Sequence, residues 1–376
     1  MKIANEQRLE ILRKKLKKNS HEAFLVFKDE NIFYLTGFFA KDSGSILVVT
    51  ENEAILMVHF IHAANAESSA DKEKIEVIRF ISEKIKNLSE ILEKNKIKTA
   101  YIEGNNVSYD LYVSIQKELE NKNITVDSRA GFIEEFRIIK SEEEISAIKK
   151  SCAITFKAFK AISSIEHEKL ASFTEKSLAF EIEKKMIEQG SEGKSFDMIV
   201  ALNSSSALPH YEPAGKKISG GLLLLDIGCR YKKYCSDLTR TIFMDNRSKE
   251  FKKSVKIRKL MDIYDIVLQS QILALKACRA GITCKELDRV ARRYIEDKGF
   301  GKYFGHGLGH GVGLEIHELP TVSFAEDNVL KDGMVITIEP GIYIEGTGGV
   351  RIEDVVVVRD GGCENMYRDT KSMVIV

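Results

Sequence analysis

The chain has 376 residues, 57 of them basic and 56 acidic, so its formal net charge is +1. This balance argues against a nucleic-acid partner, because nucleic-acid-binding proteins normally carry a basic excess. Hydrophobic residues make up 44% and charged residues 30%, which is typical of a globular protein and not of a disordered or fibrous one. The length favours two domains, since single hydrophobic cores stop growing at roughly 250–300 residues.

The sequence shows no pattern typical of a membrane span or of a signal peptide. No apolar run reaches the roughly 18 residues of a membrane span, so we expect no membrane partner. The first residues lead directly into a charged amphipathic stretch, without the apolar region of a signal peptide. We therefore expect a cytoplasmic protein, in which the six cysteines are reduced and structural.

The first part of the chain alternates short apolar runs with helical patterns. Apolar residues at helical spacing predict helices at 6–18, 82–95 and 109–121. Strands are predicted at 23–27, 45–49, 54–58, 75–78 and 99–102. This alternation predicts an α/β domain, which we place at residues 1–133.

The second domain, 134–376, begins at a joint. Ser141 followed by Glu144 is a capping box, and it predicts a helix that runs to about Ile165. Further helices are predicted at 174–188, 248–279 and 284–297, interleaved with strands at 222–227, 239–244, 334–339 and 351–358. The fold class expected overall is α/β (α+β).

Two blocks of the second domain, 174–244 and 284–358, share one order of parts. Each has an amphipathic helix, a segment with histidine, and an apolar strand that ends in a carboxylate, Asp226 or Glu339. Each then returns on a second strand with another acid, Asp237 or Glu353. This order indicates a duplicated unit folded around a shared centre.

The four acids point to metal chemistry. One carboxylate at the end of a buried strand is explained well enough by a salt bridge to an arginine. Four converging carboxylates would repel one another unless a cation neutralised them. Oxygen ligands together with an imidazole suit Mn, Co, Fe or Zn better than Ca or Mg.

The histidines are unevenly distributed. Four of the eight lie in the motif regions of the second domain: His210, His306, His310 and His317. Segment 305–313 alternates glycine with larger residues, which allows tight backbone packing while two imidazoles enter a site. A flexible loop and a phosphate cradle are the alternatives. The G-x-G-x-x-G spacing of dinucleotide-binding loops is absent. The pair His317–Glu318 fails as a zincin motif, because position 321 is Thr and Pro320 would break the helix.

The remaining candidates are better explained by structure. For four histidines we expect surface positions or packing roles with satisfied hydrogen bonds: His21, His59, His62 and His167. Cys229 and Cys235 flank the first hairpin turn, and we expect them to be structural and not metal ligands.

Five separated motifs resemble those of the methionine aminopeptidase, aminopeptidase P and prolidase family. They are Ser206–His210, Asp226 with Ser236–Thr241, His306 to Glu318, Ile338–Tyr343 and Gly349–Asp354. Segments 136–141 and 31–38 resemble the proline-specific branch and its creatinase-like N-terminal domain. The resemblance implies a pseudo-symmetric pita-bread fold for the second domain.

Carried over to this sequence, the resemblance also implies a site. The implied metal ligands are Asp226, Asp237, His310, Glu339 and Glu353, with Asp237 and Glu353 shared by two ions. Glu339 would also act as general base. The implied substrate-binding residues are His210, His306 and His317. His210 and His317 would also hold the tetrahedral intermediate. Arg351 and Tyr343 would support the bridging acids from behind.

The activity implied first is that of an Xaa-Pro aminopeptidase. It would hydrolyse the bond before proline with a hydroxide shared by two divalent ions, Mn being expected, on proline-containing peptides and as a homodimer. An Xaa-Pro dipeptidase with the same chemistry is the alternative, and a non-catalytic pita-bread binding module is a further one.

Overall fold

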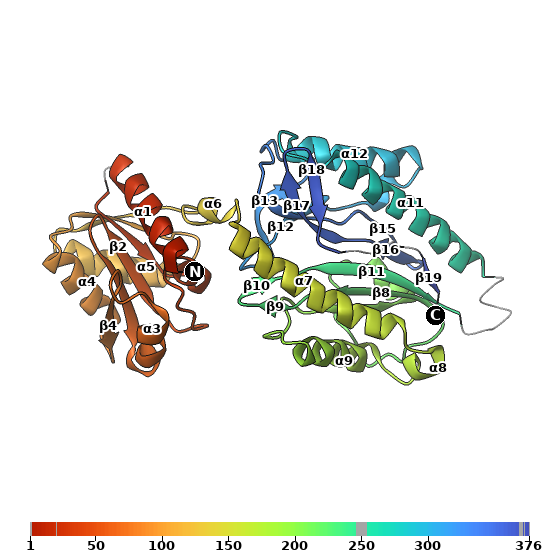
Figure 1. Ribbon diagram of the computed structural model, residues 1–376, viewed down its shortest axis with the longest axis horizontal. Coiled ribbons are helices and arrows are strands. Elements are labelled where there is room, and N and C mark those ends of the chain that lie inside the picture. Colours follow the sequence, from red (N-terminus) through yellow and green to blue (C-terminus); the bar gives the residue numbers. More distant parts are fainter. Residues whose placement is uncertain (1, 20, 246–253, 368–370, 372, 376) are drawn as a thin grey trace. The chain divides into compact units, whose positions relative to one another are not determined.

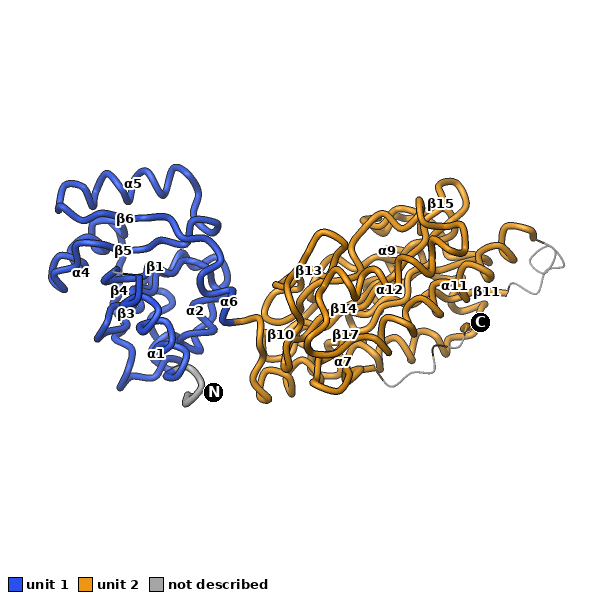
Figure 2. The backbone as a smooth tube through the Cα atoms, turned by 90° about the horizontal axis from the view of Figure 1, so that it is seen from above, with its two compact units in different colours: residues 1–136 blue, residues 137–376 orange. Residues whose placement is uncertain are grey.

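The computed structural model describes residues 2–19, 21–245, 254–367, 371 and 373–375. The chain divides into two compact units, residues 1–136 and 137–376, coloured separately in Figure 2. The domain boundary between residues 133 and 134 stays a prediction. None of the described helices combines the length and the apolar composition needed to cross a bilayer.

The first unit contains a six-stranded sheet with the order β4-β3-β2-β1-β5-β6. The predicted strands correspond to β1 (Ala23–Val26), β2 (Ile46–Thr50), β3 (Ala54–His59), β4 (Glu76–Phe80) and β5 (Thr99–Ile102). The sixth strand, β6 (Thr125–Ser128), was not predicted. Strand β1 is antiparallel to β2 and parallel to β5, so the sheet is mixed.

Helices accompany this sheet. They are α1 (Lys2–Lys18), α2 (Asp29–Thr36), α3 (Ala63–Ser69), α4 (Lys84–Lys94), α5 (Tyr109–Glu120) and the short α6 (Glu134–Arg137). In α4 the side chains of Leu88, Ile91 and Leu92 recur at helical spacing and are buried in the core of the unit, which also contains Leu25 and Met57. The predicted α/β class of this part is confirmed.

The second unit contains a mixed four-stranded sheet, in which β19 is parallel to β11, an antiparallel five-stranded sheet and two hairpins. The α-helices in its described residues are α7 (Glu142–Ser163), α8 (His167–Leu170), α9 (Glu175–Glu188), α11 (Val255–Ala277) and α12 (Cys284–Asp297). One sheet has the order β19-β11-β8-β7, from β7 (Ile199–Leu202), β8 (Gly221–Ile227), β11 (Leu238–Met244) and β19 (Val374–Ile375). The other has the order β13-β12-β14-β17-β18, from β12 (Gly309–Gly311), β13 (Glu318–Val322), β14 (Val335–Ile338), β17 (Asp354–Arg359) and β18 (Gly362–Asn365). The hairpins are β9 (Arg230–Tyr231) with β10 (Tyr234–Cys235), and β15 (Gly341–Ile344) with β16 (Gly348–Arg351).

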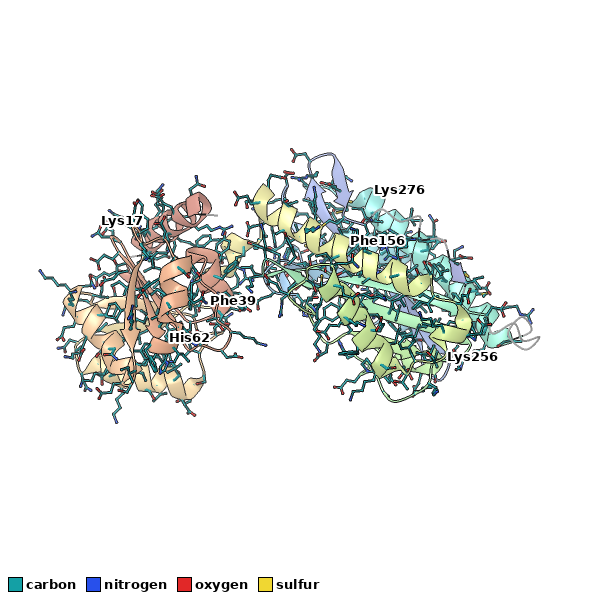
Figure 3. All side chains as sticks on the ribbon, turned by 60° about the horizontal axis from the view of Figure 1, so that its bottom comes forward. Lys17, Phe39, His62, Phe156, Lys256 and Lys276 are labelled. Carbon is teal, nitrogen blue, oxygen red and sulfur yellow. The ribbon has the colours of Figure 1, made fainter. Side chains whose placement is uncertain are left out.

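The two halves of this unit repeat one plan. Helices α9 and α12 each begin after a threonine, Thr174 or Thr283, that forms a capping box with the residue three positions on. Both threonines also form an isolated antiparallel bridge to a later segment. In Figure 1 the pairs α7–α9 and α11–α12 lie on opposite sides of the strands, and Lys256 and Lys276 mark the two ends of α11 in Figure 3.

Local signals fix several helix starts. The side chain of Ser141 accepts a hydrogen bond from the N–H of Glu144, whose carboxylate accepts one from the N–H of Ser141, so the predicted capping box is confirmed. The predicted helix 248–279 is α11 from Val255 to Ala277, and the predicted residues 248–253 lie outside the described part of the chain.

The single strand predicted at 351–358 is wrong. The chain forms two strands there, β16 and β17, because β16 pairs with β15 whereas β17 pairs with β14. The change of partner falls at Ile352 and Glu353, and it leaves the Glu353 backbone outside both ladders.

Candidate metal centre and active site

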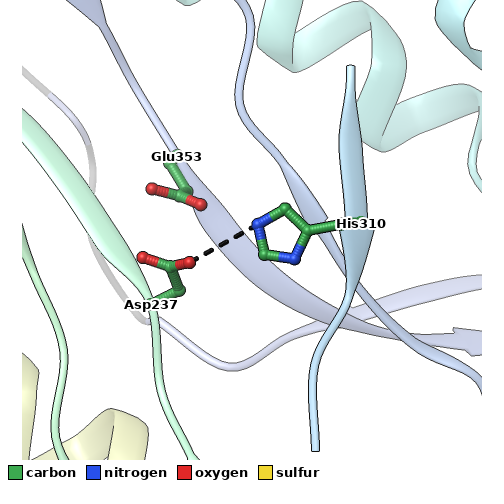
Figure 4. Close-up of side chains that lie close together, drawn as sticks. All are labelled: Asp237, His310 and Glu353. Carbon is green, nitrogen blue, oxygen red and sulfur yellow. Dashed lines mark ion pairs between the residues drawn. The ribbon is translucent and has the colours of Figure 1, made fainter. Parts of the chain in front are cut away.

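Three side chains from separate segments of the chain meet in the second unit. Ligand atoms of Asp237, His310 and Glu353 all lie within 4.8 Å of one another. Figure 4 shows these three side chains together. Asp237 directly precedes β11, Glu353 directly precedes β17 and His310 lies in the middle of β12. The distance from His310 Nε2 to Asp237 Oδ2 is 3.6 Å.

The two remaining predicted ligands border this cluster. Glu339 directly follows β14, and its Oε1 lies 3.3 Å from His310 Nε2. Asp226 lies in β8, where its cross-strand partner in β11 is Thr239. Asp226 also forms an ion pair with Arg351, whose Nε is 4.0 Å from Glu339 Oε2. The structure therefore brings all five residues into one neighbourhood.

The carboxylates of the cluster repel one another, and this repulsion raises their pKa values. Burial raises the pKa of Asp237, and the charges of Glu353, Asp226 and Glu339 raise it further. Burial likewise raises the pKa of Glu353 and of Glu339, with neighbouring acids adding to the effect. A cation bound among these oxygens would lower these pKa values, because it stabilises the charged carboxylates.

Two atoms support that fit. Oδ1 of Asp226 and Oδ1 of Asp237 are buried and have no hydrogen-bond partner among the described residues. Burial lowers the pKa of His310, which favours the neutral imidazole that binds a metal. Carboxylate oxygens and one neutral imidazole are a donor set that suits first-row divalent ions.

A hydrogen-bonded chain supports the cluster from behind. Thr239 Oγ1 donates to Glu353 Oε2 at 2.6 Å and accepts from Arg351 Nε at 3.0 Å. Arg351 Nη1 also lies 2.9 Å from the Tyr343 hydroxyl. The direct carboxylate partner of Arg351 is therefore Asp226, and not one of the two acids that it was expected to support; Thr239 provides the link to Glu353.

Two threonines of the site escaped the sequence analysis. Thr337 Oγ1 accepts from the main-chain N–H of His310 at 3.0 Å and donates to Glu339 Oε1 at 3.2 Å, so it holds two predicted ligands at once. Thr239 lies within a quoted motif but was given no role. Their signal in the sequence is a polar residue in an otherwise apolar buried strand.

The other predicted histidines surround this centre unevenly. The ring of His317 lies edge-on to that of His310, with 4.4 Å between centroids, and its pKa is lowered by burial and by the charges of His310 and His210. His306 Nε2 lies 3.0 Å from the Tyr343 hydroxyl. His210 lies in an exposed position of the segment after β7.

At Gly309 and Gly311, the alternating glycines allow the tight backbone packing that was predicted. A Cβ on Gly309 would lie 2.1 Å from the carbonyl oxygen of Thr337, and a Cβ on Gly311 would lie 2.3 Å from that of Leu319. Larger residues at these two positions would push β12 away from its neighbours and move His310 between them.

Outside the site, the expectation of satisfied histidines is only partly met. His21 pairs with Asp127 at 2.9 Å and stacks on Tyr101. In contrast, Nδ1 of His59 and Nδ1 of His167 are buried without a hydrogen-bond partner in the described part of the chain.

The two hairpin cysteines are buried. Cys229 Sγ accepts from Thr155 Oγ1 at 3.3 Å, and Cys235 Sγ donates to the carbonyl of Leu314 at 3.5 Å. Burial raises the pKa of Cys235 to about 12, which keeps this thiol protonated.

Comparison with known proteins agrees with this geometry. Residues 146–360 match the model of metallopeptidase family M24, and residues 8–139 match the creatinase/prolidase N-terminal domain. An Xaa-Pro dipeptidase from Pyrococcus furiosus is 37% identical over 371 residues, covering 98% of this chain and all of that protein.

Two solved structures extend the likeness to the fold. An Xaa-Pro dipeptidase from Bacillus anthracis superposes with a TM-score of 0.90 at 33% identity and covers 99% of this chain and 100% of its own. An X-Pro aminopeptidase from Thermotoga maritima has a TM-score of 0.83 at 34% identity and covers 96% of this chain and 100% of its own. The second unit therefore has the pita-bread fold, and the chain belongs to metallopeptidase family M24, with a creatinase/prolidase N-terminal domain.

Proposed function

We propose that this protein is a metal-dependent Xaa-Pro dipeptidase, which hydrolyses the peptide bond before proline in Xaa-Pro dipeptides. The convergence of three carboxylates on His310, beside Asp226 and its partner Arg351, supports hydrolysis. The full-length likeness to Xaa-Pro dipeptidases supports the choice of substrate. The initial prediction of an aminopeptidase has weaker support.

The metal site in this proposal consists of five residues. They are Asp226, Asp237, His310, Glu339 and Glu353, of which Asp237 and Glu353 would serve both of two divalent ions. The bound ions would supply a water of lowered pKa and an electrophile for the scissile carbonyl. Manganese is our expectation among Mn, Co, Zn and Fe.

Glu339 is the proposed general base. Its carboxylate is oriented by the hydroxyl of Thr337, which donates to Oε1 at 3.2 Å, and a positioned carboxylate can take up and release a proton. It would accept a proton from the attacking water and pass it to the departing proline nitrogen. That nitrogen needs the proton, because it becomes the amine of free proline.

The histidines bind the substrate in this proposal. His317, beside His310, would donate a hydrogen bond to the oxyanion, and His210 would hold the substrate and the intermediate together with it. His306 would contact the substrate from the side of Tyr343. The bond before proline is a tertiary amide without N–H, so recognition must rely on the ring shape and on the free amine.

An Xaa-Pro aminopeptidase is the second candidate, favoured by the likeness to the Thermotoga enzyme. A non-catalytic module is disfavoured, since such a protein has no need to bury acids that repel one another. The homodimer and the cytoplasmic location stay predictions.

A paired assay separates the two peptidases. With Mn²⁺ present, we expect release of proline from an Xaa-Pro dipeptide and a rate at least about tenfold lower on the matched Xaa-Pro-Yaa tripeptide, which is about 1.4 kcal/mol of discrimination. Preferential cleavage of the tripeptide would replace the dipeptidase by the aminopeptidase.

A further inference from the structure

A buried ion pair on α12 lies behind the segment that carries His306. Asp288 is completely buried, and Arg292, one turn later, binds it in bidentate fashion: Nε is 2.7 Å from Oδ2 and Nη2 is 2.8 Å from Oδ1. A buried carboxylate is costly unless paired and hydrogen-bonded. Neither residue belongs to the proposed metal or substrate set, so the pair calls for a role of its own.

Both members of the pair hold main-chain groups of residues 304–308. Arg292 Nη1 donates to the carbonyl of Phe304 at 2.9 Å, and Nη2 donates to the carbonyl of His306 at 2.7 Å. Asp288 Oδ1 accepts from the N–H of Leu308 at 3.0 Å. Three alternate residues of this segment are thus attached to one helix.

The guanidinium is itself held in place. It lies over the ring of Phe304 at 4.2 Å and over the ring of Phe324 at 5.1 Å, two cation–π contacts that restrict its orientation. The planar fork of Arg292 is needed for this arrangement, since one ammonium group cannot reach two carboxylate oxygens and two carbonyls in fixed directions.

The same segment contacts the candidate site on its other side. His306 Nε2 lies 3.0 Å from the hydroxyl of Tyr343, which contacts Arg351. The carbonyl of Leu308 accepts from the N–H of Glu339 at 2.8 Å. A displacement of residues 304–308 would therefore move a proposed substrate contact and the backbone of a proposed ligand.

The first half of the unit uses a similar anchor. Glu175, at the start of α9, is completely buried and accepts from the hydroxyl of Tyr211 at 2.7 Å and from the N–H of Ala214 at 3.2 Å. These two residues follow His210 closely in the chain. In both halves, a buried acid on the equivalent helix anchors the loop that carries a proposed substrate histidine.

We propose that Asp288 and Arg292 form a positioning unit, which fixes the backbone of residues 304–308 so that His306 meets the substrate in a productive orientation. The role of His306 in this inference rests on the proposed function. A misplacement of about 1 Å in such a contact costs on the order of 100-fold in rate.

The first test needs no substrate. Hydrogen exchange of the full-length protein is compared between wild type, R292K and R293K, the last being a matched change at an exposed arginine of the same helix. For R292K we expect faster exchange in a peptide covering residues 304–310. For R293K we expect exchange of this peptide at the wild-type rate, and over β8 we expect no change in either variant. D288N, which keeps an acceptor oxygen, should accelerate the same peptide. Unaltered exchange at 304–310 in both R292K and D288N would overturn the proposal.

The second test is a double-mutant cycle of R292K with H306A on an Xaa-Pro substrate. In the wild-type background, R292K should lower kcat/KM roughly 10- to 100-fold. In the H306A background, R292K should lower kcat/KM by less than about threefold. Additive effects would show that Arg292 does not act through His306. If the wild type cleaves neither Xaa-Pro substrate, the proposed function fails, and the exchange test still decides whether the pair positions this segment.

Discussion

Arg137 and Glu318 form a buried ion pair in which a second cation takes part. Both side chains are almost fully inaccessible, and Lys140 Nζ lies 3.0 Å from Glu318 Oε2. The carboxylate of Glu318 also accepts from the N–H of Glu315 at 3.1 Å. Because Glu318 follows His317 directly, this cluster fixes the segment that brings His317 to His310.

This cluster predicts a pH dependence of stability. The charges of Lys140 and Arg137 outweigh the effect of burial and lower the pKa of Glu318 from 4.5 to about 2. A lowered carboxyl pKa stabilises the folded state above about 4.5, and this contribution is lost as the pH falls towards about 2. Urea unfolding of wild type should therefore show falling stability across that window.

The variant E318Q should lose this part of the pH dependence. At neutral pH, breaking the buried pair should cost about 3–5 kcal/mol in the free energy of unfolding, since buried Lys140 loses its acid and buried Arg137 is left with Glu315. E345Q, at an exposed position, is the matched control and should leave the unfolding curve almost unchanged. Equal stability of E318Q and E345Q would contradict the assigned role of the cluster.

Thr239 should matter for metal affinity because it connects Glu353 with Arg351. We expect T239V to weaken binding of Mn²⁺ by about 10- to 100-fold, the usual cost of losing a partner that orients a ligand. T239S keeps the hydroxyl and should bind nearly as wild type does. Calorimetric titration measures both, and indifference of the affinity to T239V would remove Thr239 from the site.

Replacement of Glu339 by Gln tests the assignment of the general base. The amide keeps the shape and one oxygen but cannot accept the proton, so kcat should fall by at least about 100-fold. Circular dichroism and thermal unfolding should show an intact fold. An E339Q variant with near-normal turnover would require another base.

The sequence predicted the elements of this fold where one local signal was strong. The capping box at Ser141 and the buried run Leu222–Leu225 before Asp226 both specify their elements within a few residues. The break between β16 and β17 was missed, because residues 350–358 contain no glycine or proline that would mark it, and only pairing partners far apart in sequence divide the run.

The part of the site that belongs to recognisable sequence motifs could be predicted from the sequence. The five proposed ligands were identified by their place at strand ends and by resemblance. The positioning groups were not, since Asp288 and Arg292 look like an ordinary helical ion pair until the carbonyls of residues 304–308 are placed beside them. Glu318 was likewise considered in a failed zincin motif and at the end of a family motif, without a role of its own, whereas its partner Arg137 lies 181 positions away.

The central claim is that the five-residue cluster holds the metal on which cleavage of Xaa-Pro dipeptides depends. The most direct measurement is the release of free proline from such a dipeptide by protein stripped with a chelator and then titrated with Mn²⁺, for wild type, D237N and the exposed control D297N. The account predicts no release after stripping, recovery on titration for wild type and D297N, and no recovery for D237N. Proline release that persists after chelation, or full recovery in D237N, would contradict it.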